Sequence, residues 1–174
     1  MDCGKLALFV LMFLALVLAG CDRSSQNDIV QQVQQDQNCL KRVDVRLIAA
    51  TLKRSTAAME AAIKSGADVN AAVEGLGPPI VVAALGDYKG VQLLLDSSAN
   101  INAEDGEGYT ALINASFTNS ADIVRLLLSK GANVNASSNL TIKGKKTRIT
   151  PLMIAKSQGH QEIVKLLTDA GANE

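Results

Sequence analysis

The strongest constraint on the fold is a pattern of two short apolar runs and a terminator that occurs four times along the chain. The clearest copy spans residues 110–136, TALINASFTNSADIVRLLLSKGANVNA. Its apolar residues follow helical spacing on both sides of a break at Asn119 and Ser120, and Ser120 is a suitable N-cap for the second helix. The second run stops at Gly131, where glycine adopts a left-handed conformation cheaply. Such units bury their apolar faces by stacking on one another.

The terminators of the four copies set the period of the repeat. They are Gly66, Ser98, Gly131 and Gly171, separated by 32, 33 and 40 residues. The last separation is longer because an insertion precedes the fourth copy. We therefore predict a domain over 44–174 with repeats at about 44–71, 72–103, 104–136 and 147–174 and an insertion at 137–146.

The motifs within these copies resemble the ankyrin family from Asp44 to Asn173. They include Thr150-Pro151-Leu152, Gly159-His160 and the ending Gly66-Ala67-Asp68-Val69-Asn70. The first copy lacks the family's Thr-Pro-Leu-His, and the second has Pro78 for Thr and one residue fewer near Leu85. The resemblance implies an all-α solenoid of four helix-turn-helix repeats with short β-turn fingers. It also implies a protein-binding role without catalysis.

The repeat register predicts which side chains form the core. We expect one apolar residue of each second helix to stack in a line: Ile63, Leu94, Leu127 and Leu167. Small residues are expected where helices approach closely, at Ala49, Ala50, Ala83, Ala84, Ala115 and Ala155.

The N-terminal segment 1–20 has the features of an export signal. A thin positive region at Lys5 precedes an apolar run from Leu6 to Leu18, which is too short to span a bilayer. The run ends in Leu18-Ala19-Gly20-Cys21, which resembles the lipobox of bacterial lipoproteins. That resemblance implies that Cys21 becomes the lipid-modified first residue of the mature protein, placing it in the cell envelope facing the periplasm. The alternative is an ordinary secretory signal with an incidental cysteine. Asp22 resembles the inner-membrane retention signal of enteric bacteria.

Residues 21–43 are polar and rich in Gln. We interpret them as a tether followed by a helix that starts near Asp28, with Ile29, Val33 and Leu40 on one side to cap the first repeat. The alternative is a flexible spacer. Cys39 is the cysteine that remains after signal removal and lipidation, so the mature chain has no intramolecular disulfide. We expect Cys39 to be a half-buried apolar residue; the alternative is an intermolecular disulfide.

Candidate chemistry is sparse along the chain. His160 is the single histidine, and we expect it to make a structural hydrogen bond. Without Cys or carboxylate partners at ligand spacing it predicts no metal site, and the chain has no phosphate-binding loop or nucleophile motif. A net charge of +0 and 3% aromatic residues argue against nucleic-acid binding. We expect that the protein is not an enzyme and binds no cofactor.

The residues predicted to contact a partner lie in the third repeat and in the segment between it and the fourth. By its position in the family pattern, the turn before that repeat offers Glu104, Asp105, Glu107 and Tyr109, and its first helix offers Phe117 and Thr118. Tyr109 and Phe117 are the strongest candidates because exposed aromatic side chains often anchor interfaces. The alternative is that Phe117 packs beneath the next turn.

The segment from Ser137 to Arg148, which contains the insertion before the fourth repeat, is basic and contributes Lys143, Lys145, Lys146 and Arg148 as further partner-binding candidates. Beside the acidic turn of the third repeat it would give a polarised edge, which favours orientation and fast association of a partner. Two alternatives are contact with anionic lipid headgroups and a solvated, mobile loop.

Taken together, the sequence predicts a non-enzymatic ankyrin lipoprotein that binds a periplasmic protein partner. One role is a scaffold or helper of a periplasmic enzyme, for instance one that handles oxidative stress. The alternative is an immunity protein that neutralises a toxin such as a lipase in the periplasm. A toxin gene beside this one would favour immunity.

Overall fold

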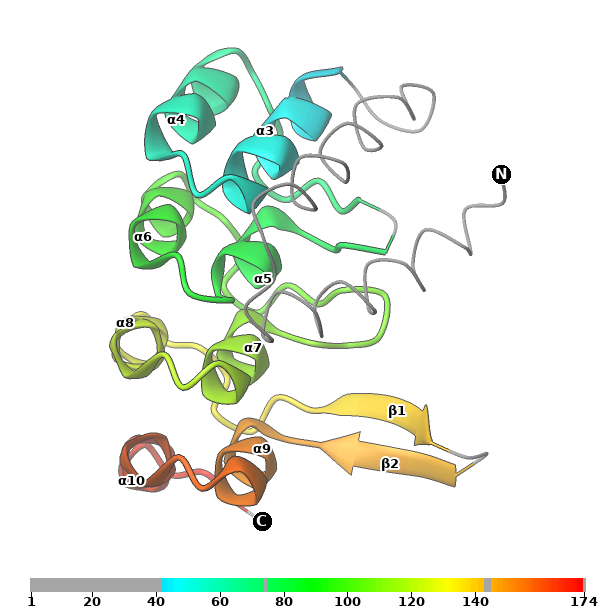
Figure 1. The fold of residues 1–174 in the computed structure, drawn as a ribbon, viewed down its shortest axis with the longest axis vertical. Coiled ribbons are helices and arrows are strands. Elements are labelled where there is room, and N and C mark those ends of the chain that lie inside the picture. Colours follow the sequence, from blue (N-terminus) through cyan, green and yellow to red (C-terminus); the bar gives the residue numbers. More distant parts are fainter. Residues whose placement is uncertain (1–41, 74, 143–144, 174) are drawn as a thin grey trace.

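The computed structural model describes residues 42–73, 75–142 and 145–173, and these fold into a stack of helix pairs. In Figure 1 the first helices of the pairs form one column, the second helices form another, and the connecting fingers project from the first column. The pairs are α3 (Arg42–Leu52) with α4 (Thr56–Lys64), α5 (Pro79–Ala83) with α6 (Tyr88–Asp96), α7 (Ala111–Phe117) with α8 (Ala121–Ser129), and α9 (Pro151–Gln158) with α10 (Gln161–Asp169). The predicted helical solenoid is confirmed.

Polar side chains cap the starts of several helices. Thr110 accepts a hydrogen bond from the backbone N–H of Ile113, and Thr150 accepts one from Met153, with Pro151 at the first helical position. Ser120 also occupies the N-cap position of α8, but its side chain makes no capping bond.

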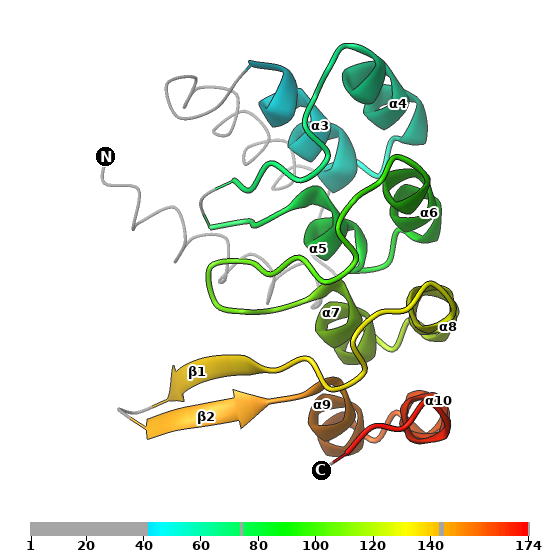
Figure 2. The ribbon, with the colours of Figure 1, turned by 180° about the vertical axis from the view of Figure 1, so that it is seen from behind.

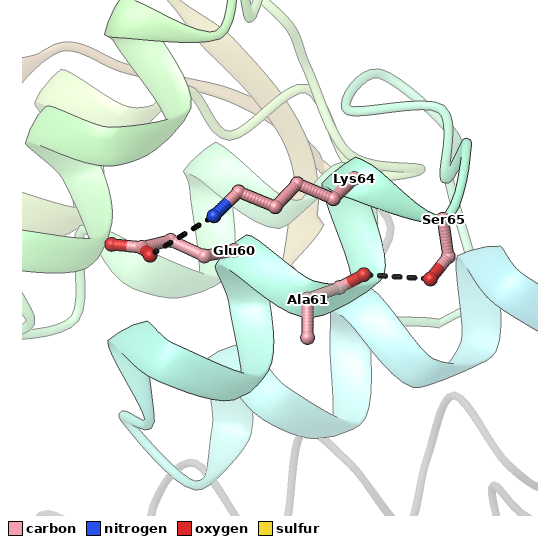
Figure 3. Close-up of polar contacts among 4 residues, drawn as sticks. All are labelled: Glu60, Ala61, Lys64 and Ser65. Atoms are coloured by element: carbon pink, nitrogen blue, oxygen red, sulfur yellow. Dashed lines mark hydrogen bonds and ion pairs between the residues drawn. The ribbon is translucent and has the colours of Figure 1, made fainter.

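The ends of the second helices confirm the predicted terminators. Gly66, Ser98, Gly131 and Gly171 all have positive φ, from 67° at Ser98 to 89° at Gly66. Figure 3 shows the end of α4, where the Ser65 hydroxyl donates to the Ala61 carbonyl at 2.8 Å and Lys64 pairs with Glu60 at 3.9 Å. The ion pair is solvent-exposed and contributes little to stability.

The core lies between successive helix pairs, and one predicted residue is wrong by one position. Leu94, Leu127 and Leu167 are fully buried. The predicted small residues, the six alanines named above, are also buried. In the first repeat, however, Ala62 is buried and Ile63 is half-buried. Ala62 precedes Gly66 by the same four residues that separate Leu94 from Ser98, so it occupies the stacked position.

Hydrogen bonds also join one repeat to the next at the ends of the second helices. The Asn102 side-chain oxygen accepts from the Asn133 backbone N–H at 2.8 Å. The equivalent pairs along the stack are Asn70 with Asn100 and Asn135 with Asn173. Within the first repeat, Asp44 at the start of α3 accepts a similar bond from the Asp68 backbone N–H. This polar row holds consecutive repeats at a fixed spacing.

The insertion belongs to a β-hairpin, and the alternative of a solvated loop is wrong for its described residues. Strand β1 (Ser138–Ile142) pairs antiparallel with β2 (Lys145–Ile149), and the hairpin projects beyond the other fingers (Figures 1 and 2). The predicted signal segment, Cys21, Asp22, Cys39 and the predicted capping helix lie outside the described residues. Among the helices that are described, none is long and apolar enough to cross a membrane.

Candidate protein-binding surface

The third finger, residues 104–110, is shaped by the side chain of Asp105. Its Oδ1 accepts hydrogen bonds from the backbone N–H groups of Glu107 and Tyr109, both at 2.9 Å. Gly108 supports the turn with φ of 81°, and a bridge between Glu104 and Thr110 closes the base of the finger. Four predicted partner-binding residues are therefore held in one compact turn.

Partial burial of this finger changes its electrostatics. Desolvation raises the pKa of Glu107, and the nearby charge of Asp105 raises it further. Desolvation also raises the pKa of Tyr109, with added contributions from Glu107 and Asp105. The Tyr109 hydroxyl therefore stays protonated at neutral pH and can donate a hydrogen bond. The Glu107 carboxylate is destabilised in its charged form, so a cation from a partner would stabilise it.

The third finger carries Glu104, Asp105 and Glu107 and is called the acidic finger from here on. It contacts a neighbouring projection on each side. The second finger is closed by a bridge between Val73 and Gly77. A Cβ atom added at Gly77 would approach the Cβ of Asp105 to 2.5 Å, so this finger packs tightly against the third. On the other side, the buried Ser138 hydroxyl donates to the Glu107 carbonyl at 2.6 Å. Ser138 begins β1, so this bond fixes the base of the hairpin beside the acidic finger.

The structure places most of the predicted basic residues on the second strand of the hairpin. Lys145, Lys146 and Arg148 belong to β2, and the Arg148 side chain is exposed. Lys143 lies outside the described residues. An acidic finger and a basic strand thus belong to adjacent projections of the stack (Figure 2).

The two predicted residues at the end of α7 differ in what they can offer a partner. Phe117 is 36% exposed, which is high for an aromatic side chain. The Thr118 hydroxyl donates to the Asn114 carbonyl at 3.1 Å and lies 2.9 Å from the Ser120 hydroxyl. Because the Thr118 hydroxyl already makes hydrogen bonds within the chain, Phe117 is the better candidate to anchor a protein partner.

Two other exposed apolar side chains were missed from the sequence. Tyr88 is 43% exposed at the start of α6, and Met153 is 46% exposed on α9. Met153 occupies the repeat position of Ile113, which is fully buried, so the repeat register alone predicts burial. For Tyr88, its place directly after the N-cap Asp87 was an available signal of exposure.

His160 makes the structural contact expected of it. Its Nδ1 lies 2.9 Å from the Ser116 carbonyl oxygen, which ties the fourth repeat to the third. Within the described ranges there is no group of three or more His, Cys, Asp or Glu side chains that could hold a metal ion.

Comparison with known proteins identifies the family of this stack. Residues 47–138 match a family model of three ankyrin repeats, and residues 148–174 match the model of a single ankyrin repeat. The chain belongs to the ankyrin-repeat family. The ankyrin repeats make it a protein–protein interaction module, and such domains are generally non-catalytic.

Similar curated proteins share the repeats over part of this chain. Ankyrin repeat and KH domain-containing protein mask of Drosophila melanogaster is 39% identical over 88 residues, covering 51% of this chain and 2% of that protein. Ankyrin repeat and SOCS box protein 3 of Bos taurus is 33% identical over 93 residues, covering 53% of this chain and 17% of that protein. Alpha-latrocrustotoxin-Lt1a of Latrodectus tredecimguttatus is 26% identical over 129 residues, 71% of this chain and 9% of that protein. The ankyrin chain thus spans a small part of each relative's length.

Proposed function

We propose that this ankyrin protein is a bacterial lipoprotein that is tethered to the membrane through Cys21 and binds a protein partner in the periplasm. Its role is to position that partner, as a scaffold or helper of a periplasmic enzyme. The observation that carries the proposal is the acidic third finger bonded to the base of a basic hairpin through Ser138 and Glu107. Adjacent projections of opposite charge orient a charged partner and speed its association.

Aromatic side chains next to these charges support the same surface. Tyr109 is half-buried in the acidic finger, and Phe117 is partly exposed at the end of α7 in the same repeat. Aromatic residues dominate the energy of many interfaces because they bury a large area at low entropic cost. We assign the anchoring to Phe117 and Tyr109, and the steering to the charged residues around them.

The tether is supported by the sequence Leu18-Ala19-Gly20-Cys21 after an apolar run. Lipid on this cysteine would hold the ankyrin stack at the membrane, since each buried CH₂ contributes about 0.8 kcal/mol. Labelling cells with an acyl probe tests this step. We expect Cys21→Ser to lose the label and Cys39→Ser to keep it; labelling of Cys21→Ser would contradict the tether.

Binding is tested with the anchored chain purified in detergent and a partner captured from membranes. We expect Phe117→Ala or Tyr109→Ala to weaken that partner's binding by about 2 kcal/mol. Lys89→Ala on α6 is the control and should change it by less than about 0.5 kcal/mol. Capture of a periplasmic enzyme supports the scaffold role. Capture of a toxin that loses its activity in the complex would replace that role with neutralisation.

A further inference from the structure

The β1–β2 hairpin has one strand edge that faces away from the third finger (Figures 1 and 2). Strand β1 lies on the side of the third finger, where Ser138 is bonded to the Glu107 carbonyl, and β2 lies on the far side of β1 in both ribbon views (Figures 1 and 2). In the part of the chain that the structure describes, the sheet has two strands, and β2 pairs with β1 alone. The other edge of β2 is therefore open over Lys145–Ile149.

The register of the hairpin indicates which backbone groups this edge presents. Ile142 pairs with Lys145, and two residues separate the strands in the sequence. In a two-residue hairpin the pair next to the connection exchanges both backbone hydrogen bonds, and bonded and non-bonded pairs then alternate. The backbone N–H and C=O groups of Lys146 and Arg148 accordingly face away from β1 and are available to another extended chain.

The charge of the β2 side chains indicates which kind of extended chain would bind this edge. Three of the five residues of β2, KKTRI, are cationic. Lysines on an edge strand disfavour pairing with a second copy, because like charges would lie opposite each other. An acidic strand has the complementary charge and meets no such repulsion.

We propose that the open edge of β2 binds an extended, acidic segment of the protein partner as a third strand. This inference rests on the protein-binding role proposed above and names the chemistry of its ligand. The segment would pair over about 17 Å, the length of a five-residue strand. Its backbone would bond to Lys146 and Arg148, and its carboxylates would offset the charge of β2.

Two labelled peptides test strand addition on the full chain purified in detergent. One is a peptide of about ten residues that alternates Glu and Val, and the other has the same sequence with every second amide N-methylated. N-methylation keeps the charge but removes the donors along one edge. We expect the first peptide to bind and the second to bind at least about tenfold more weakly. Hydrogen exchange of the β2 amides should slow only with the first.

Three protein variants separate backbone pairing from charge. Lys146→Pro removes an outward N–H, a change that edge strands tolerate, and should weaken the peptide at least about tenfold. Lys146→Gln should weaken it less, because it removes a charge and keeps the N–H. Lys165→Gln on α10 is the charge control and should bind within about twofold of the wild type.

Four results would overturn strand addition. They are no binding of the acidic peptide, equal binding of both peptides, self-association of the full chain through β2, and equal peptide binding by wild type and Lys146→Pro. Vesicles of phosphatidylglycerol are the probe for a lipid surface. Binding to vesicles but not to the peptide would assign the basic strand to the membrane.

The captured partner distinguishes failure of this inference from failure of the proposed function. If the partner binds Lys146→Pro as tightly as the wild type but binds Phe117→Ala weakly, strand addition is wrong and the protein-binding role stands. If neither substitution weakens binding while changes on the second helices do, strand addition and the finger-side binding surface are both wrong.

Discussion

The Asn114 side-chain amide donates a 3.0 Å hydrogen bond to the backbone carbonyl of Val81, joining α7 of the third repeat to α5 of the second. Helix α5 ends at Ala83, and the N–H of Leu85 donates to Val82 at 3.2 Å instead of continuing the α-helical ladder to Val81. The second repeat is one residue shorter near Leu85 than the third. Asn114 therefore satisfies a buried carbonyl that the shorter helix leaves without its usual partner.

We expect Asn114→Ala to destabilise the protein by about 1–3 kcal/mol, because the Val81 carbonyl would be left buried without a partner. A urea melt of the purified domain measures this. The control Gln92→Ala, at an exposed site on α6, should change the free energy of unfolding by less than about 0.5 kcal/mol. Equal effects of the two substitutions would mean that the hydrogen bond contributes nothing to stability.

We expect Leu127→Ala to have a larger effect, about 2–5 kcal/mol, because Leu127 is fully buried between repeats and its truncation leaves a cavity. The same denaturation experiment measures it. Lys89→Ala, exposed on α6, is the matched control and should stay within about 0.5 kcal/mol of the wild type. A small loss at Leu127 would contradict the stacked core.

We expect Ser98→Gly to stabilise the protein by about 0.5–1 kcal/mol. Ser98 has φ of 67°, in the left-handed region that costs a side-chain-bearing residue about 1–2 kcal/mol. Glycine avoids that strain but gains entropy in the unfolded chain, which offsets part of the benefit. The opposite change at the equivalent position of the third repeat, Gly131→Ser, should destabilise the protein. Urea melts measure both variants, and a higher urea midpoint for Gly131→Ser than for wild type would contradict this.

The raised pKa of Glu107 predicts the sign of a pH dependence. Between the unfolded pKa of about 4.3 and the higher folded pKa, the native state binds more protons than the unfolded state, so stability falls as pH rises through that range. Glu107→Gln removes this cost. Its stability relative to wild type should therefore be greater at about pH 7 than at about pH 3, which lies below both pKa values. Urea melts at both values measure this, and a larger advantage at the lower pH would reverse the assignment.

Much of the repeat architecture could be predicted because it depends on local chemistry. Gly131 ends a helix through its backbone freedom, Thr150 and Pro151 start one, and His160 makes the structural contact expected of it. Each of these signals is contained within a few residues. The error at Ile63 arose because Ala62 and Ile63 are both apolar, and only the distance to Gly66 distinguishes the stacked position.

The hairpin and the exposure of Met153 depend on contacts between repeats, which local patterns do not specify. The strands at 138–142 and 145–149 are short and polar, so composition alone did not separate them from a solvated loop. The hydrogen bond from Ser138 to Glu107 links residues 31 apart in the sequence. The sequence placed opposite charges on neighbouring projections, but this contact is what fixes the hairpin beside the acidic finger.

Photo-crosslinking in the cell can show whether a protein partner binds on the finger side of the ankyrin stack. A photoreactive phenylalanine analogue would replace either Phe117, at the end of α7, or Lys89, on α6 in the opposite column of helices. We expect a discrete protein adduct from position 117 and none from position 89. The same adduct from both positions, or an adduct from position 89 alone, would contradict it.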